Sequence, residues 1–266
     1  MKTKFGIVGC GFLGNIVADA YTMGLLPDYE LVGVTSRSLS SAQKTAQAVG
    51  CQACESVEEL LALKPEYVVE TASVQSVRDM AEDVLRSGAN LVVISIGAFA
   101  DLIFYEKVKA AARESGTKVH LANGAIGGFD VLQTVTLMAH AQKLEQQAGI
   151  TTHTGARGFV NTPVWADHLL TDTEKTQVFT GNAKEAIATF PRRVNVAVAT
   201  SLATTGPDIT GVTMYSVPNW QGDDHCITAE IDGVKAVVDI YSRTSSIAGW
   251  SVVALLRNLA SPVCFY

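Results

Sequence analysis

The sequence predicts an α/β protein in which a doubly wound parallel sheet is joined to a second, smaller mixed α+β domain. In the first half, short β-branched runs alternate with amphipathic helical patterns, which is typical of βαβ units. After Ala122 this alternation ends and strand patterns dominate. The chain has 266 residues, enough for one large domain or two modest ones.

The first domain is predicted from strands that alternate with helices. A strand at residues 4–8 leads through a glycine-rich turn into a helix at residues 12–25, which Pro27 is expected to end. Glycines at positions 50, 88 and 116 are expected to close three later helices. The further strands are at 31–35, 67–71, 91–96 and 118–122, and the further helices are at 41–49, near 56, at 75–87 and at 102–115.

The second domain begins with a loop at residues 123–128 and a helix at 130–142. Its expected strands are 150–155, 178–180, 212–216, 226–231 and 234–240. Two helices interrupt them, at 183–189 before Pro191 and at 195–203. We therefore expect a dinucleotide-binding domain at 1–122, joined by the C-terminal helix in 245–266, and a substrate and catalytic domain at 123–244.

Composition excludes several classes of protein. Apolar residues make up 48% of the chain, so it is not a disordered sequence. The net charge of −6 does not favour binding to nucleic acid or to an anionic membrane surface. No apolar run reaches the ~18 residues that a membrane span needs. Five widely spaced cysteines, an odd number, fit reduced thiols and predict a cytoplasmic protein.

The segment Gly9-Cys-Gly11-Phe-Leu-Gly14 lies between the first strand and the first helix. In this context Gly9 permits a tight turn, Gly11 lets the backbone approach a pyrophosphate, and Gly14 lets the helix lie close to the strand. The helix N-terminus then offers free N–H groups to the phosphates. The motif predicts a Rossmann-type domain that binds a dinucleotide.

The end of the second strand carries no acidic residue to bind a ribose 2′-hydroxyl. It reads Ser36-Arg37-Ser38, in which the guanidinium can pair with a 2′-phosphate and the hydroxyls can hydrogen-bond to it. The sequence therefore favours NADP, with NAD as a possible second cofactor. The alternative is that Arg37 is an ordinary solvated side chain.

Taken together, the motifs of the chain resemble those of the L-aspartate dehydrogenase family. The matching segments are Gly9 to Gly14, Val69-Glu-Thr-Ala72, Leu91-Val-Val-Ile-Ser-Ile-Gly-Ala98, Gly124-Ala-Ile-Gly127, Phe190-Pro-Arg-Arg-Val-Asn-Val-Ala197, His225 with Ile227, and Arg243-Thr-Ser245. The resemblance implies oxidation of L-aspartate to iminoaspartate, which hydrolyses to oxaloacetate and ammonia, or the reverse amination. It assigns the catalytic histidine to His225 and cofactor contacts to the loop at 124–128 and to Asn195. The full set of predicted cofactor contacts is Gly9, Gly11, Phe12, Leu13, Gly14, Ser36, Arg37, Ser38, Ala72, Gly97, Ala125, Gly128 and Asn195.

His225 also fits this role by its chemistry. Oxidising an amine needs a base that is uncharged near neutral pH, and imidazole is the side chain that titrates there. We expect His225 at the edge of a loop, with Asp223 and Asp224 raising its pKa or orienting its ring. The alternative is a surface histidine beside two acids.

A small dicarboxylate amino acid as substrate needs cationic groups, and arginine pairs with carboxylates through two hydrogen bonds. The predicted substrate-binding residues are Arg157, Arg243, Thr244, Ser245 and Glu70. Glu70, at the end of the third strand, is expected either to shape the site or receive a proton, or to be a plain structural acid. Residues 156–158 depart from the basic Arg-Lys-Pro run of many family members, which leaves the group that binds the distal carboxylate open.

Two alternatives keep the fold and change the function. One is an NADP-dependent dehydrogenase or imine reductase for another small amino or oxo acid, and the other is a dinucleotide-binding sensor without catalysis. No metal is expected, because the histidines lack ligand spacing. By analogy, the apolar strands of the second domain are expected to pair across a two-fold axis, which gives a homodimer.

Overall fold

The computed structural model describes residues 2–190 and 195–265. It divides into two compact units, one of residues 1–124 with 246–266 and one of residues 125–245. Pro191, which the sequence analysis expected to end a helix, lies outside the described residues. Among the described helices, none is both long enough and apolar enough to cross a membrane.

The first unit contains a six-stranded parallel sheet, which confirms the predicted doubly wound domain. The strand order is β3-β2-β1-β4-β5-β6. The strands are β1 (Thr3–Val8), β2 (Tyr29–Thr35), β3 (Gln52–Cys54), β4 (Tyr67–Glu70), β5 (Asn90–Val93) and β6 (Val119–Leu121). The edge strand β3 was not predicted, because three residues are too few for a recognisable alternation.

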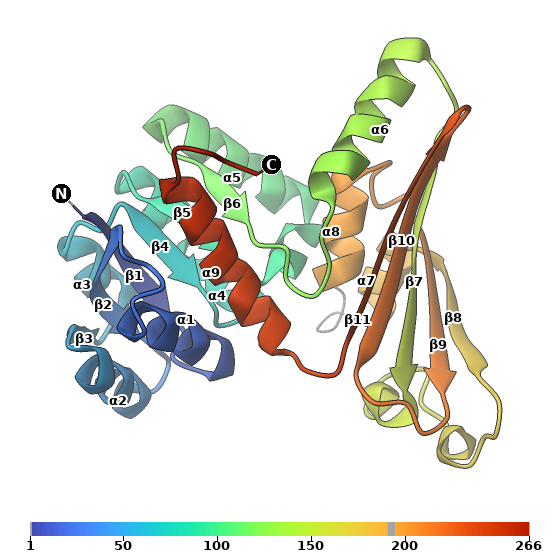
Figure 1. The fold of residues 1–266 in the computed structure, drawn as a ribbon, viewed down its shortest axis with the longest axis horizontal. Helices are drawn as coiled ribbons and strands as arrows, with labels where there is room; N and C mark the ends of the chain where they lie inside the picture. Colours follow the sequence, from blue (N-terminus) through green and yellow to red (C-terminus); the bar gives the residue numbers. More distant parts are fainter. Residues whose placement is uncertain (1, 191–194, 266) are drawn as a thin grey trace. The chain divides into compact units, whose positions relative to one another are not determined.

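Helices cover both faces of this sheet (Figure 1). They are α1 (Phe12–Thr22), α2 (Leu39–Val49), α3 (Val57–Ala62), α4 (Val74–Arg86), α5 (Leu102–Ser115) and α9 (Ser246–Ala260), with a 3₁₀ helix, η1, at Ile96–Ala100. Helices α1, α2 and α9 enclose one core with Phe5 and Ile7 of β1. On the other face, the missing side chain of Gly6 makes room for Leu60 of α3.

Two of these elements end three residues earlier than the sequence predicted. Helix α1 stops at Thr22 instead of residue 25, because Gly24 takes a left-handed conformation with φ of 75°. Strand β5 stops at Val93 instead of residue 96. The backbone N–H groups of Ile94 and Ser95 donate to the carboxylate of Glu70 and not to a neighbouring strand.

The second unit contains a five-stranded mixed sheet, which confirms the predicted smaller domain. The strand order is β11-β10-β7-β9-β8, and only β7 and β9 run parallel. The strands are β7 (Gln147–Gly155), β8 (Thr176–Asn182), β9 (Gly211–Val217), β10 (Asp223–Ile231) and β11 (Val234–Ser242). The helices are α6 (Phe129–Gln142), α7 (Ala183–Thr189) and α8 (Asn195–Ala203), and two short 3₁₀ helices that were not predicted, η2 (Ala156–Phe159) and η3 (Asp167–Leu170), follow β7.

The two faces of this second sheet differ in burial. Because successive side chains of a strand point to opposite faces, His225 and Ile227 of β10 lie on one face and Asp224 and Cys226 on the other. Helices α6, α7 and α8 cover the face that holds the buried residues (Figure 1). In the part of the chain that the structure describes, no helix covers the opposite face, which we call the open face.

Candidate active site

The glycine-rich loop has the geometry that binding of a pyrophosphate requires. Gly9 has φ of 107°, and a Cβ there would lie 2.7 Å from the backbone carbon of Thr71. A Cβ on Gly14 would overlap the carbonyl oxygen of Gly9, so only glycine lets α1 lie this close to the loop. A Cβ on Gly11 would meet no atom within 4 Å. The backbone at Gly11 is thus open to a ligand, and the loop fits a dinucleotide.

The other predicted cofactor contacts of the first unit lie at the same edge of the sheet. The Gly9 N–H donates to the carbonyl of Thr35 at 2.8 Å, which joins the loop to the end of β2. The Thr71 hydroxyl donates to the Gly9 carbonyl at 2.8 Å, which joins it to the end of β4. Segment 36–38 follows β2, Ala72 follows β4 and Gly97 follows β5 within η1. Ligands of open α/β sheets bind at this carboxyl edge.

The predicted cofactor contacts at this edge differ in how exposed their side chains are. Phe12, the first residue of α1, is 60% exposed, and Leu13 is half-buried. Arg37 is exposed, as is Ser38, whose Oγ lies 2.7 Å from Oγ of Ser40. The guanidinium of Arg37 is therefore accessible to a phosphate from solvent.

Glu70 lies at the carboxyl end of β4, where its carboxylate binds groups of the protein itself. Its side chain is fully buried. One carboxylate oxygen accepts the Ala72 N–H at 2.8 Å and the Ser95 hydroxyl at 2.9 Å. The other accepts the N–H groups of Ile94 and Ser95 at 3.3 and 3.0 Å. Burial raises the pKa of Glu70, and these four hydrogen bonds oppose the rise. Glu70 holds together the two loops that carry Ala72 and Gly97.

His225 is the third residue of β10 and is buried, with 7% of its surface exposed. This differs from the expected position at the edge of a loop, because β10 begins at Asp223. Its Nδ1 lies 3.0 Å from Oγ1 of Thr152, the residue directly opposite on β7. Burial is the main effect on the ring and lowers the pKa of His225 below its usual value. His225 is therefore uncharged at neutral pH.

The neighbouring acids act on the pKa of His225 in the expected direction, but they do not set its net shift. Asp223 and Asp224 favour the protonated ring, but burial outweighs both, so the pKa of His225 falls. Thr152 is the hydrogen-bond partner at Nδ1 of the ring, and alternation along β10 turns Asp224 to the open face. There its carboxylate lies 3.4 Å from Nδ1 of His153.

The sheet brings the predicted arginines to the same end as His225. Asp223 at the start of β10 pairs with Thr154 near the end of β7 and with Ser242 at the end of β11. Arg157 lies just beyond the first of these strand ends, in η2, and Arg243 just beyond the second. Both are exposed, as are Thr244 and Ser245, and Nε of Arg243 donates to the Tyr241 hydroxyl at 3.1 Å.

The remaining predicted contacts of the second unit lie near the starts of helices. Gly128 caps α6 with φ of 71°, and a Cβ there would lie 2.5 Å from Cγ2 of Val238 on β11. Ala125 lies in the loop before it and is half-buried. Asn195 is the first residue of α8 and is exposed. On β11, Val238 pairs with Ile227 of β10, and Ile240 pairs with His225. Gly128 therefore packs against β11 two residues from Ile240.

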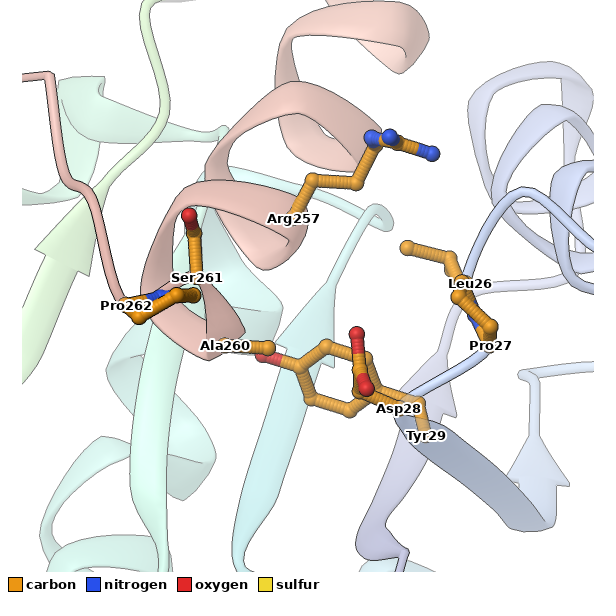
Figure 2. Close-up of a pocket in the computed structure, with 8 residues that line it drawn as sticks. All are labelled: Leu26, Pro27, Asp28, Tyr29, Arg257, Ala260, Ser261 and Pro262. Atoms are coloured by element: carbon orange, nitrogen blue, oxygen red, sulfur yellow. The ribbon is translucent and has the colours of Figure 1, made fainter.

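A pocket of about 220 Å³ in the first unit is separate from these residues (Figure 2). It opens where β2 begins, whereas the glycine-rich loop follows the end of β1. Nη1 of Arg257 donates to the Leu25 carbonyl at 2.8 Å, and the Tyr29 hydroxyl donates to the Leu256 carbonyl at 2.7 Å. These bonds attach α9 to the segment that leads into β2. The lining residues are Leu26, Pro27, Asp28, Tyr29, Arg257, Ala260, Ser261 and Pro262.

Two residues that support the site, Thr152 and Ser95, were not among the predicted ones. Alternation along a strand at 150–155 places Thr152 on the same face as Ile150, but only the register with β10 identifies His225 as its partner. Ser95 was assigned to a strand. Among the described residues, no group of three or more histidine, cysteine or acidic side chains is placed to hold a metal ion.

Known proteins resemble the chain over its full length. A family model described as "Aspartate dehydrogenase, C-terminal" matches residues 135–259, and one described as "Homoserine dehydrogenase, NAD binding domain" matches residues 6–122. The L-aspartate dehydrogenase of Methanocaldococcus jannaschii is 30% identical over 276 residues, and that of Methanosarcina mazei is 31% identical over 272. Each alignment covers 98% of both chains.

Solved structures agree on the fold. The crystal structure of aspartate dehydrogenase from Thermotoga maritima matches with a TM-score of 0.75 at 22% identity, and the match covers 100% of both chains. GenD2 from gentamicin A biosynthesis, solved in complex with NAD, matches with a TM-score of 0.52 at 16% identity over 90% of this chain and 72% of its own. The first unit is thus an NAD(P)-binding domain.

Proposed function

This chain belongs to the L-aspartate dehydrogenase family, and we propose that it oxidises L-aspartate to iminoaspartate, which water converts to oxaloacetate and ammonia. It is an NAD(P)-dependent oxidoreductase. The observation that carries the chemistry is His225, a buried and uncharged imidazole in the second unit of a chain whose first unit binds a dinucleotide.

The protein contributes binding and proton transfer to this reaction. Gly9, Gly11 and Gly14 would hold the pyrophosphate of a dinucleotide at the start of α1. A bound nicotinamide would supply the acceptor for the hydride of the substrate Cα. A hydride leaves readily only from a neutral amine, so His225 accepts the amine proton at Nε2, the ring nitrogen that does not face Thr152. The same group returns a proton in the amination direction.

Two exposed arginines are the proposed partners of the substrate carboxylates. Arg157 and Arg243 lie beyond strand ends at the end of the sheet that also holds His225. A guanidinium can bind each carboxylate through two parallel hydrogen bonds. Thr244 and Ser245 add hydroxyl donors next to Arg243, and Asn195, Ala125 and Gly128 remain proposed cofactor contacts.

Formation of NADPH or NADH from L-aspartate, followed by absorbance, tests the proposal directly. The reverse reaction is tested by consumption of the reduced cofactor with oxaloacetate and ammonia. D-Aspartate, L-glutamate and L-alanine serve as comparison substrates. Turnover of another acid without turnover of aspartate or oxaloacetate would instead favour the dehydrogenase of different specificity. Binding of the dinucleotide without any turnover would favour the sensor.

We further propose that NADP is the preferred cofactor, because the exposed Arg37 and two serines occupy the position where an acid would bind a ribose hydroxyl. Arg37→Ala is expected to raise KM for NADP by about tenfold or more, through loss of a charge-assisted hydrogen bond, and to change KM for NAD little. Arg78→Ala, an exposed arginine on α4, is the matched control. A wild-type enzyme with kcat/KM for NAD equal to or above that for NADP would contradict the preference.

The open face of the second sheet supports the proposed homodimer. On β11 it carries Val237 and Tyr241, 53% and 47% exposed, and it continues over β10, β7 and β9 with half-buried residues such as Thr228 and Tyr215. The same face also carries the charged residues Glu230, Lys235 and Asp239, so it is mixed in polarity, and exposed apolar side chains grouped on one face commonly mark a site of association. A second copy presenting the same face would bury both.

The expected mass in solution is twice the 28.2 kDa of the chain, measured by sedimentation equilibrium. Val237→Arg is expected to shift the protein toward the monomer, because it places an unpaired charge in the interface. Val263→Arg, at a valine that is 66% exposed in the other unit, should leave the mass unchanged. A monomeric wild-type protein would rule out the homodimer.

The cytoplasmic location remains a proposal that rests on the cysteines. All five are free thiols in the structure. Thiols that remain reduced in the purified enzyme without loss of activity, measured by thiol titration, would agree with it.

A further inference from the structure

Thr152 and His225 form a hydrogen-bonded pair across two neighbouring strands. They are directly opposite in the antiparallel pairing of β7 and β10, so their side chains lie on the same face of the sheet. Oγ1 of Thr152 lies 3.0 Å from Nδ1 of His225. The exposed fractions are 8% for Thr152 and 7% for His225, so little water competes for this bond.

We propose that Thr152 is a positioning residue for the reaction: its hydroxyl oxygen accepts the Nδ1–H of His225 and so holds the imidazole in the tautomer with a free electron pair on Nε2. The proposal rests on the proposed role of His225 as the base. It assigns to Thr152 the orientation of the ring and the choice of tautomer, and no contact with substrate or cofactor.

A hydroxyl suits this position better than a carboxylate. A hydroxyl oxygen can accept the Nδ1–H both when the ring is neutral and when it carries a second proton. A carboxylate would also bind that hydrogen, but it would favour the charged ring and raise its pKa. Thr152 therefore fixes the ring and leaves burial free to lower the pKa of His225.

The geometry of the strand makes Thr152 a rigid partner. Threonine branches at Cβ, which restricts the rotation of its side chain. The neighbours on the same face, Ile150 on β7 and Ile227 on β10, are buried and pair with each other in the next matching position of the ladder. The register that places Oγ1 at Nδ1 is thus maintained by the core itself.

Thr152→Val keeps the shape of the side chain and removes the hydroxyl. It is expected to lower kcat about tenfold or more and to leave KM for the dinucleotide unchanged, since a misplaced base loses only part of its effect. The acid limb of the kcat/KM profile should move to lower pH, because the protonated ring loses an acceptor. Thr152→Ser restores the hydroxyl and should recover activity to within about threefold of wild type. Thr151→Val, on the open face of the same strand, is the matched control.

The tautomer can be measured without turnover, by ¹⁵N NMR of protein labelled at its five histidines. The signals that disappear in His225→Asn identify His225. We expect Nδ1 to carry the proton in wild type and in Thr152→Ser, and the other tautomer or a mixture in Thr152→Val. An unchanged tautomer together with an unchanged pH profile in Thr152→Val would overturn the proposal.

The role of His225 as the base and the role of Thr152 in positioning it can be disproved separately. If His225→Ala retained full activity, His225 would not be the base, while the NMR spectra would still show whether Thr152 sets its tautomer. If Thr152→Val loses activity and also unfolds at a lower temperature, Thr152→Ser distinguishes a loss of ring positioning from a loss of stability. A serine variant that is stable, has the wild-type tautomer and yet stays as slow as the valine variant would contradict the proposed positioning role.

Discussion

Replacing His225 with alanine is expected to lower kcat at least about a hundredfold, because general base catalysis by a positioned side chain contributes ~10²–10⁴ to a rate. The dissociation constant for NADP should change little, since the glycine-rich loop that holds the pyrophosphate belongs to the other unit of the chain. Steady-state kinetics and a fluorescence titration with NADPH measure the two effects. His168→Ala, whose side chain is 62% exposed in η3, is the control and should retain wild-type kcat.

The pH dependence follows from the direction of the pKa shift. Burial lowers the pKa of His225 below its ordinary value of 6.5, so the folded enzyme keeps this base uncharged at neutral pH. We expect kcat/KM to fall toward acid pH with an apparent pKa below 6.5, and this limb should be absent in His225→Ala. A wild-type rate in the alanine variant, or an acid limb that survives the substitution, would remove His225 from the mechanism.

Local rules predicted much of the first unit from the sequence. The helix at residues 102–115 has the predicted bounds, because Asp101 accepts N–H groups of the first turn and Gly116 ends the helix in a left-handed conformation. Both signals lie next to the helix in the chain. The end of β5 was predicted three residues too late, because the group that draws Ile94 and Ser95 out of the strand, Glu70, lies 24 and 25 residues away.

In the candidate site, too, contacts between residues far apart in the chain could not be predicted from the sequence. The family resemblance and the chemistry of imidazole pointed to His225, but its burial depends on where β10 begins. One strand position decides which face Asp224 occupies, and the burial of His225 in the strand outweighs the effect of both acids and lowers its pKa. The partner Thr152 lies 73 residues away in the chain, so only the pairing of β7 with β10 reveals it. Sequence patterns predict which segments form helices and strands. The register between strands, which they do not predict, determines which side chains meet in the site.

Glu70→Gln is expected to destabilise the fold by about 2 kcal/mol, which corresponds to a fall in melting temperature of about 5 °C. The carboxylate receives a backbone N–H on each oxygen, from Ala72 on one and from Ile94 and Ser95 on the other. In glutamine one oxygen becomes an NH₂ group, so a donor faces a donor whichever way the amide turns. Thermal unfolding followed by circular dichroism measures the loss. Glu82→Gln, in an exposed ion pair on α4, should change stability by less than about 0.5 kcal/mol.

The stability difference should also depend on pH. Because burial raises the pKa of Glu70 above the 4.5 of the unfolded chain, its contribution to stability is complete below that value and declines as the pH rises through the folded pKa. Glutamine does not titrate, so the difference in unfolding free energy between wild type and Glu70→Gln should become smaller as the pH rises.

The dissociation constant of Glu70→Gln for the dinucleotide should be severalfold higher than that of wild type, because the loops at Ala72 and Gly97 loosen. A variant with wild-type melting temperature but a much lower kcat would instead return Glu70 to the proton-accepting role that its burial and four hydrogen bonds argue against.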